Sequence, residues 1–127
     1  MATINTDIAQ TTDIIARSNN SFNLKININN SSGGDFDLTG YKVYFEIKAA
    51  ATSVLLRGLT NDTSSEYTSN NLYSTTAVSI ADGTITMAES ADNMNITKGV
   101  YKYTLKLKSS EGQLKTWMLG KFKINDD

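Results

Sequence analysis

Few residue types in this sequence are suited to catalytic chemistry. The 127 residues include no histidine and no cysteine. Histidine is the usual general base near neutral pH and a common zinc ligand, and cysteine supplies thiolate nucleophiles and soft metal ligands. A catalytic site would therefore have to be built from carboxylates, lysines, tyrosines and hydroxyls. The composition predicts a protein that is not an enzyme and that uses no cofactor.

Asp35 and Asp37 lie close together in a glycine-rich loop and could bring two carboxylates to a calcium ion. A calcium loop usually supplies more oxygen ligands in a defined order. Aspartate side chains in loops also bond nearby backbone amides and so shape a turn. We favour the turn-shaping role and predict no metal site. A glycosidase would need its paired carboxylates to face a cleft, which nothing in the sequence indicates.

Lysines recur on the predicted outward side of the last two strands. Lys102, Lys106 and Lys108 share one parity, and Lys121 and Lys123 face the same way on the next strand, with Lys115 further along. Such a surface is either a footprint for an acidic protein or nucleic acid, or a solvated face that protects sheet edges from aggregation. We favour the solvated face. The sequence pI of about 5.3 and the expected absence of arginine here make nucleic acid an improbable partner.

Trp117 and Leu119 have the opposite parity from Phe122 and Ile124, which face the predicted core. Two interpretations remain open. A bulge near Gly120 would return both side chains to the core. Otherwise they are exposed anchors of the kind that dominate protein–protein contacts, and Tyr44, outward on its own strand, joins them.

Period-two alternation of apolar and polar residues predicts most of the structure. Ile14 and Ile15 belong to a short apolar edge strand, and a polar arm covers residues 1–11. Turn signals at regular spacing indicate about seven to eight short strands, hence an all-β fold, one antiparallel β-sandwich over residues 12–127. The expected strands are 13–16, 22–28, 41–48, 54–56, 77–80, 84–87, 101–108 and 114–124. A long loop (60–76) and one helical turn (90–94) connect them.

No apolar run approaches the ~20 residues that span a bilayer. The first ten residues (MATINTDIAQ) also lack the basic start and apolar centre of a signal peptide. We therefore expect a chain that is made in a cytoplasm and not secreted, without a membrane partner.

Four segments carry a resemblance to a known group of domains. They are Asp37-Leu38-Thr39-Gly40-Tyr41 before an alternating strand, Ala81–Met87 (ADGTITM), Gly99–Leu105 (GVYKYTL) and Gly120–Ile124 (GKFKI). Their order is similar to that in the N-terminal Ig-like domain of tailed-phage baseplate upper proteins and in small phage head or tail proteins. The resemblance covers Phe22 to Ile124 and implies an Ig-like sandwich. The motifs are structural, so no catalytic or ligand residue is implied.

The resemblance implies a structural protein of a tailed-phage virion, made in the host cytoplasm. It would dock on capsid or tail proteins as a decoration, head-fibre or adaptor subunit. Baseplate proteins continue into further domains where this chain ends, which favours a small accessory role. The contact elements would be residues 1–16, the 60–76 loop and the Trp117/Leu119 face, and particle symmetry suggests a homo-oligomer such as a trimer. The alternative is a carbohydrate- or cell-surface-binding module in which Tyr44, Tyr67, Tyr73 and Trp117 stack on sugar rings.

Overall fold

Alternating side chains build two facing sheets in the computed structural model, which describes residues 10–11, 14–17, 21–28, 34, 37–81, 83–90 and 96–125. Within these ranges the chain forms ten strands and one short helix. In chain order they are β1 (Gln10–Thr11), β2 (Ile14–Arg17), β3 (Phe22–Asn27), β4 (Lys42–Ala49), β5 (Leu55–Thr60), α1 (Ser65–Thr68), β6 (Tyr73–Ser74), β7 (Val78–Ala81), β8 (Thr84–Glu89), β9 (Gly99–Lys108) and β10 (Leu114–Asn125).

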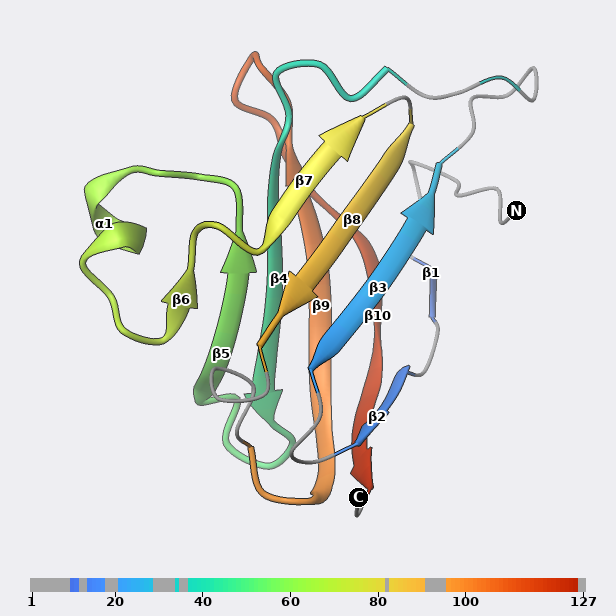
Figure 1. Cartoon of the computed structure of the whole chain (residues 1–127), viewed down its shortest axis with the longest axis vertical. Coiled ribbons are helices and arrows are strands. Elements are labelled where there is room, and N and C mark those ends of the chain that lie inside the picture. The colour runs from blue at the N-terminus through green and yellow to red at the C-terminus, as the bar shows by residue number, and fades with distance from the viewer. Residues whose placement is uncertain are drawn as a thin grey trace.

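The larger sheet has the strand order β1-β10-β9-β4-β5-β6, with β2 also paired to β10, and the smaller sheet has the order β3-β8-β7. Figure 1 shows the smaller sheet lying across the front of the larger one. The long central strands pair antiparallel, whereas the short strands β1, β2 and β6 add to the larger sheet in parallel. The predicted antiparallel sandwich is thus confirmed for its centre, with parallel additions at both edges.

The strand order is that of an immunoglobulin variable-type sandwich. In such domains strands B, E and D form one sheet, and G, F, C, C′ and C″ form the other. Here β3, β8 and β7 take the first set of places, and β10, β9, β4, β5 and β6 take the second. The predicted fold class, an all-β Ig-like β-sandwich, is confirmed.

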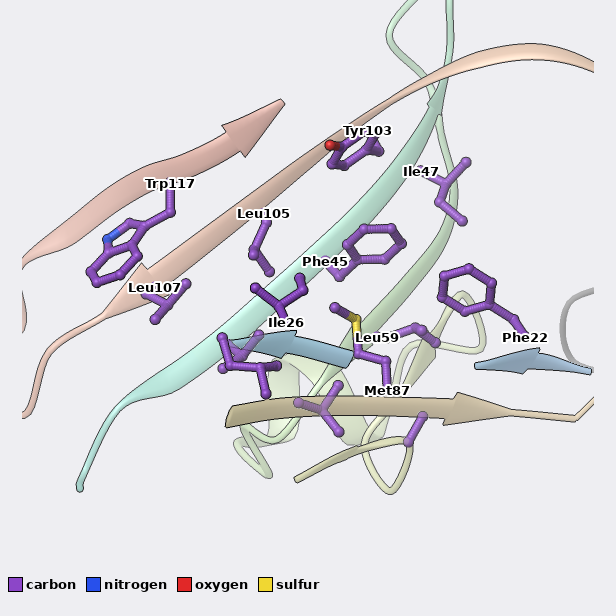
Figure 2. Close-up of a cluster of buried hydrophobic side chains, with 14 of the residues drawn as sticks. Phe22, Ile26, Phe45, Ile47, Leu59, Met87, Tyr103, Leu105, Leu107 and Trp117 are labelled. Atoms are coloured by element: carbon purple, nitrogen blue, oxygen red, sulfur yellow. The ribbon is translucent and has the colours of Figure 1, made fainter. Parts of the chain in front are cut away.

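An aromatic cluster fills the centre of the sandwich. Phe22 of β3 stacks on Phe45 of β4 with ring centroids 5.8 Å apart, and Phe45 lies 5.4 Å from the ring of Tyr103 on β9. Phe122 of β10 adds an edge contact 6.0 Å from Phe45. Antibody domains place a tryptophan and an inter-sheet disulfide at this position. This chain has no cysteine, and stacked rings provide the same inter-sheet contact (Figure 2).

Tyr101 anchors the start of β9 by a second feature of Ig-like domains. Its hydroxyl donates to the carbonyl oxygen of Thr97 at 2.5 Å, four residues upstream. A tyrosine near the start of strand F that bonds back to the preceding backbone is the tyrosine corner of this architecture. Tyr103 follows two positions later, where an antibody domain has its cysteine, and is 1% exposed.

Several expected elements differ from the structure. The hairpin of β7 and β8 is confirmed, but β5 is longer than predicted and ends at Thr60. The segment 60–76 is ordered by α1 and β6 instead of being an irregular loop. At the end of the predicted arm, Gln10–Thr11 form β1 against β10. Residues 1–9 and most of the expected helical turn (91–95) lie outside the described residues, as do Asp13 and Asp35.

Candidate functional site

The face of the larger sheet that points away from the smaller sheet, which we call the outer face, carries most of the chain's lysines. Residues directly opposite one another on neighbouring strands share a face. The registers therefore place on it Ile15 and Arg17 of β2, Lys42, Tyr44, Glu46 and Lys48 of β4, Val100, Lys102, Thr104, Lys106 and Lys108 of β9, and Leu114, Thr116, Leu119, Lys121 and Lys123 of β10. The predicted common face of Lys102, Lys106, Lys108, Lys121 and Lys123 is confirmed. The placement of Lys115 on it is wrong, because Lys115 lies before the bulge and pairs with Leu107, whose side chain faces the core. The expectation that this face has no arginine is wrong, because Arg17 lies at its edge.

Three tyrosines cover the half of the outer face formed by β4 and β5. Tyr67 of α1 lies 5.4 Å from Tyr44 and 4.9 Å from Tyr73, measured between ring centroids. The ring of Tyr73 packs directly against the backbone of Gly58. The absence of a side chain allows this contact, because a Cβ at residue 58 would lie 2.3 Å from the ring. We call Tyr44, Tyr67 and Tyr73 the tyrosine cluster.

Each of two carboxylates is held by a tyrosine of this cluster. The Tyr44 hydroxyl donates to Asp62 at 2.5 Å, and the Tyr73 hydroxyl donates to Glu46 at 2.6 Å. Glu46 also lies 3.7 Å from the ammonium nitrogens of both Lys48 and Lys106. The negative charge of Glu46 is thus already shared between two cations and a phenol.

The turn after β5 is shaped by its own polar side chains. Asn61 accepts from the backbone N–H of Val43 at 2.7 Å and donates to the Tyr41 carbonyl at 3.2 Å, so it continues the ladder beside β4. Asp62 accepts from both the backbone and the hydroxyl of Ser64, the residue before α1. Such local bonds favour turns over continued strand, and they bring Tyr67 back over the sheet.

Burial is the main cause of the raised pKa values of Tyr44 and Tyr73. It raises the pKa of Tyr44 above its usual range, and the hydrogen bond to Asp62 adds to the shift. Burial likewise raises the pKa of Tyr73, helped by Glu46. For Asp62, burial opposes ionisation, but hydrogen bonds from Ser64 and Tyr44 outweigh it and hold its pKa below the ordinary value. The cluster therefore keeps neutral phenols beside the ionised carboxylate of Asp62.

The other half of the outer face, formed by β2, β10 and β9, presents exposed apolar side chains between lysines. The exposed fractions are 67% for Ile15, 53% for Val100, 56% for Leu114 and 39% for Leu119. Ile15 and Val100 flank Lys123 on either side in register. Exposed apolar side chains gathered on one sheet face are typical of protein-contact surfaces.

Where the two halves meet, the outer face is hollowed at its β9–β10 hairpin end. The hollow has a volume of about 370 Å³ and is lined by Tyr44, Glu46, Tyr67, Lys106, Lys108, Gly112 and Leu114. Its wall combines two ammonium groups and the carboxylate of Glu46 with phenol rings and one leucine. A hollow of this kind can receive a single side chain from a partner.

The expected exposed anchor Trp117 is buried, which corrects the interpretation that it is a contact residue at the surface. A register shift between Thr116 and Met118 makes Trp117 the extra residue of a bulge, and it is 3% exposed in the core. Figure 2 draws it at the Leu107 end of the cluster. The bulge interpretation is thus correct for Trp117, though it occurs before Gly120. Leu119 is returned to the outer face, not the core.

Of the other predicted contact residues, some are buried and some remain exposed on the outer face. Tyr44 points outward as expected, but the tyrosine cluster leaves it 5% exposed, so it offers no free ring face. Ile14 packs against the core. Ile15 and Leu119 remain on the uncovered part of the outer face. Sequence reasoning missed Val100 and Leu114. Val100 has the parity of the lysines on β9, which was an available signal, whereas Leu114 has the parity of the core residue Phe122 and faces outward only because of the bulge at Trp117.

Asp37 shapes a turn, as favoured from the sequence. Its carboxylate accepts from the backbone N–H of Thr39 at 3.0 Å. Hydrogen bonding from the Thr39 side chain, and then from this N–H, lowers the pKa of Asp37. Among the described residues, no three histidine, cysteine or acidic side chains gather where they could hold a metal ion. No helix in the described part of the chain has the length and hydropathy to cross a membrane.

No protein-family model matches this sequence, and no curated protein matches it. The chain is similar to the solved structure of CopC from Methylosinus trichosporium OB3b at 12% identity, covering 93% of this chain and 84% of that one, with a TM-score of 0.41. It is also similar to a chain in the structure of ICOS in complex with ICOS-L and an anti-ICOS-L VNAR domain. That match has 14% identity and a TM-score of 0.49, and it covers 94% of this chain and 56% of that one. These values carry no conclusion about function.

Proposed function

We propose that this chain is a non-enzymatic structural protein of a tailed-phage virion that docks on capsid or tail proteins through the uncovered part of its outer face. The observation that carries the docking role is the exposure of Ile15, Val100, Leu114 and Leu119 on a single rigid sheet face. Side chains on paired strands are held in place before binding, which limits the entropy lost on association.

The virion assignment is supported by the four segments that resemble phage Ig-like domains. Each has a structural role in this chain, and that of Gly120–Ile124 is to bring Phe122 against Phe45 in the core. Asp37 and Thr39 form the turn before β4, Gly83 lies in the turn between β7 and β8 with a φ of 76°, and Tyr101 forms the tyrosine corner. An accessory subunit needs such a self-supporting domain and one contact face.

The sugar-binding alternative has less support. Ring stacking on a sugar requires an exposed aromatic face, as at other stacking sites. Trp117 and Tyr44 are 3% and 5% exposed, and the ring of Tyr73 rests on Gly58 and against Tyr67. The aromatic residues expected to contact sugar are therefore used to hold the domain together.

The proposal is tested by immunogold labelling of particles purified from the source lysate with an antibody against this chain. Gold over the heads would indicate a decoration or head-fibre subunit, and gold at one end would indicate a neck or baseplate component. Particles without label, with the chain recovered free in the lysate, would contradict the proposal. A glycan array probed with the free chain then tests the alternative.

A further inference from the structure

Three lysines stand directly opposite one another across three neighbouring strands of the outer face. Lys121 of β10 is in register with Lys102 of β9, which is in register with Lys48 of β4. Opposed residues on paired strands have Cβ atoms about 5 Å apart. We call these three residues the lysine row. A second opposed pair, Lys42 and Lys108, lies at the hairpin end of the same strands.

Like charges in directly opposed positions destabilise a sheet. Part of this repulsion is offset within the chain, since Lys48 pairs with Glu46 and Lys102 donates to the hydroxyl of Ser53. Glu46 is shared with Lys106 and Tyr73, so its one charge serves several groups. Lys121 also has an interaction partner within the chain. Among the described residues of these strands, basic side chains still outnumber carboxylates.

The outward-facing described residues of β2, β4, β9 and β10 include eight basic side chains against the carboxylate of Glu46, and the Asp62 carboxylate that follows β5 attracts Lys42. The eight are Arg17, Lys42, Lys48, Lys102, Lys106, Lys108, Lys121 and Lys123. The whole chain, in contrast, has a formal charge of −1. The positive charge is thus concentrated on one face of an otherwise acidic protein, which is the arrangement that steers a charged partner to one face.

The apolar side chains between the lysines indicate which kind of acidic partner fits. Leu119 lies next to the lysine row on one side, and Val100 and Ile15 lie on the other. Single-stranded nucleic acid would use exposed rings for stacking, and Tyr44 and Trp117 are buried. A duplex would offer phosphates to the lysines but no apolar surface to the residues between them. A protein surface can match both the lysines and the apolar residues, with carboxylates opposite the former and apolar side chains opposite the latter.

We infer that the outer face binds an acidic protein surface of another virion component, with carboxylates over the lysine row and apolar contacts at Leu119, Val100 and Ile15. This inference rests on the proposed docking role and adds the chemistry of the partner to it.

The test is co-sedimentation of the purified chain with particles from the source lysate. The double variant Lys102→Glu/Lys121→Glu should bind at least about 100-fold more weakly than the natural chain, because it opposes like charges across the contact. The matched control is Lys25→Glu, an exposed charge reversal on β3 of the smaller sheet, which should bind as the natural chain does. Binding of the natural chain should weaken between about 0.05 M and about 0.5 M NaCl.

A second measurement tests the repulsion without any partner. Lys102→Gln should raise the melting temperature of the free chain by about 2 °C at low salt, and the gain should vanish at high salt. An unchanged or lower melting temperature at low salt would contradict the lysine row as a source of repulsion. Circular dichroism of the Lys102→Glu/Lys121→Glu variant confirms that it is folded.

The outcomes separate this inference from the proposed function. If the natural chain binds particles and the double variant binds equally well, the acidic-partner inference is wrong and the virion role stands. If the natural chain neither binds nor labels particles, both fail. If the natural chain binds a double-stranded DNA fragment and the double variant does not, the partner is nucleic acid and the inference of a protein partner is wrong. If the natural chain forms an oligomer in solution and the double variant is monomeric, a second copy of the chain occupies the face and the inference of another virion component is wrong.

Discussion

Trp117 and Leu119 illustrate how one backbone irregularity decides what two side chains do. In a regular strand they would share a face, but the bulge at Trp117 gives that residue to the core and Leu119 to the surface. Bulges re-aim side chains in this way wherever two residues on one strand oppose one on its partner. The single tryptophan is thus a stability residue, and Leu119 is the contact residue.

Substitution of these two residues should therefore have unequal effects on stability. Trp117→Ala should lower the free energy of unfolding by about 3–5 kcal/mol, because it removes a buried ring from the core. Leu119→Ala should change it by no more than about 0.5 kcal/mol. Urea denaturation of both variants measures the difference. A larger loss of unfolding free energy for Leu119→Ala than for Trp117→Ala would show that Leu119, and not Trp117, packs in the core.

The buried phenols predict the behaviour of the protein at alkaline pH. The pKa values of Tyr44 and Tyr73 are raised by folding, so their contribution is fully present below the unfolded tyrosine pKa of about 10 and is lost as pH rises above it. The melting temperature should therefore fall steeply above about pH 10. Tyr44→Phe should start from a lower stability, because Asp62 loses a hydrogen bond, and should fall less steeply. Equal slopes for the two proteins would refute this origin.

At the scale of elements, the segment from β5 to β6 is a scaffold that closes half of the outer face. Its order comes from contacts between residues far apart in sequence: Tyr44 with Asp62, Glu46 with Tyr73, and Gly58 with the Tyr73 ring. These contacts leave the other half of the face open. The boundary between the two halves is the hollow beside Lys106 and Lys108.

Gly58→Ala tests how β6 is held. The added Cβ would meet the Tyr73 ring at 2.3 Å, so the ring must move and its hydrogen bond to Glu46 must weaken. We expect a loss of about 1–3 kcal/mol in unfolding free energy and faster hydrogen exchange at Tyr73 and Ser74. Leu72→Ala, at an exposed residue beside β6, is the control and should be near neutral. Unchanged exchange in Gly58→Ala would show that β6 does not depend on this contact.

The same elements show what could be predicted from the sequence. The strands that contain Phe22, Ile26, Leu105 and Leu107 alternate openly, so their inward faces follow from parity alone. The order within 60–76 could not be predicted, because polar residues without periodicity are fixed there by distant partners. Trp117 was ambiguous for a related reason. A bulge is a property of strand pairing, and one strand's sequence does not state which position its partner skips.

At the scale of the whole molecule, the sandwich separates stability from contact. The aromatic core and the tyrosine corner hold the two sheets together without a disulfide. The outer face can then carry opposed lysines and exposed apolar side chains that contribute little to folding. Of the predicted contact residues, Ile15 and Leu119 are on the uncovered part of this face. Val100 could have been added from its parity, whereas Leu114 was found only through the registers.

The central claim, that the uncovered outer face is the docking surface, is tested most directly by cysteine protection. The natural chain has no cysteine, so single cysteines report one position each. Leu119→Cys should react with a maleimide in the free chain and be protected when the chain is bound to particles. Ala88→Cys, exposed on β8 of the smaller sheet, should react equally in both states. Protection of Ala88→Cys with unchanged reactivity of Leu119→Cys would show that the chain docks through its other sheet.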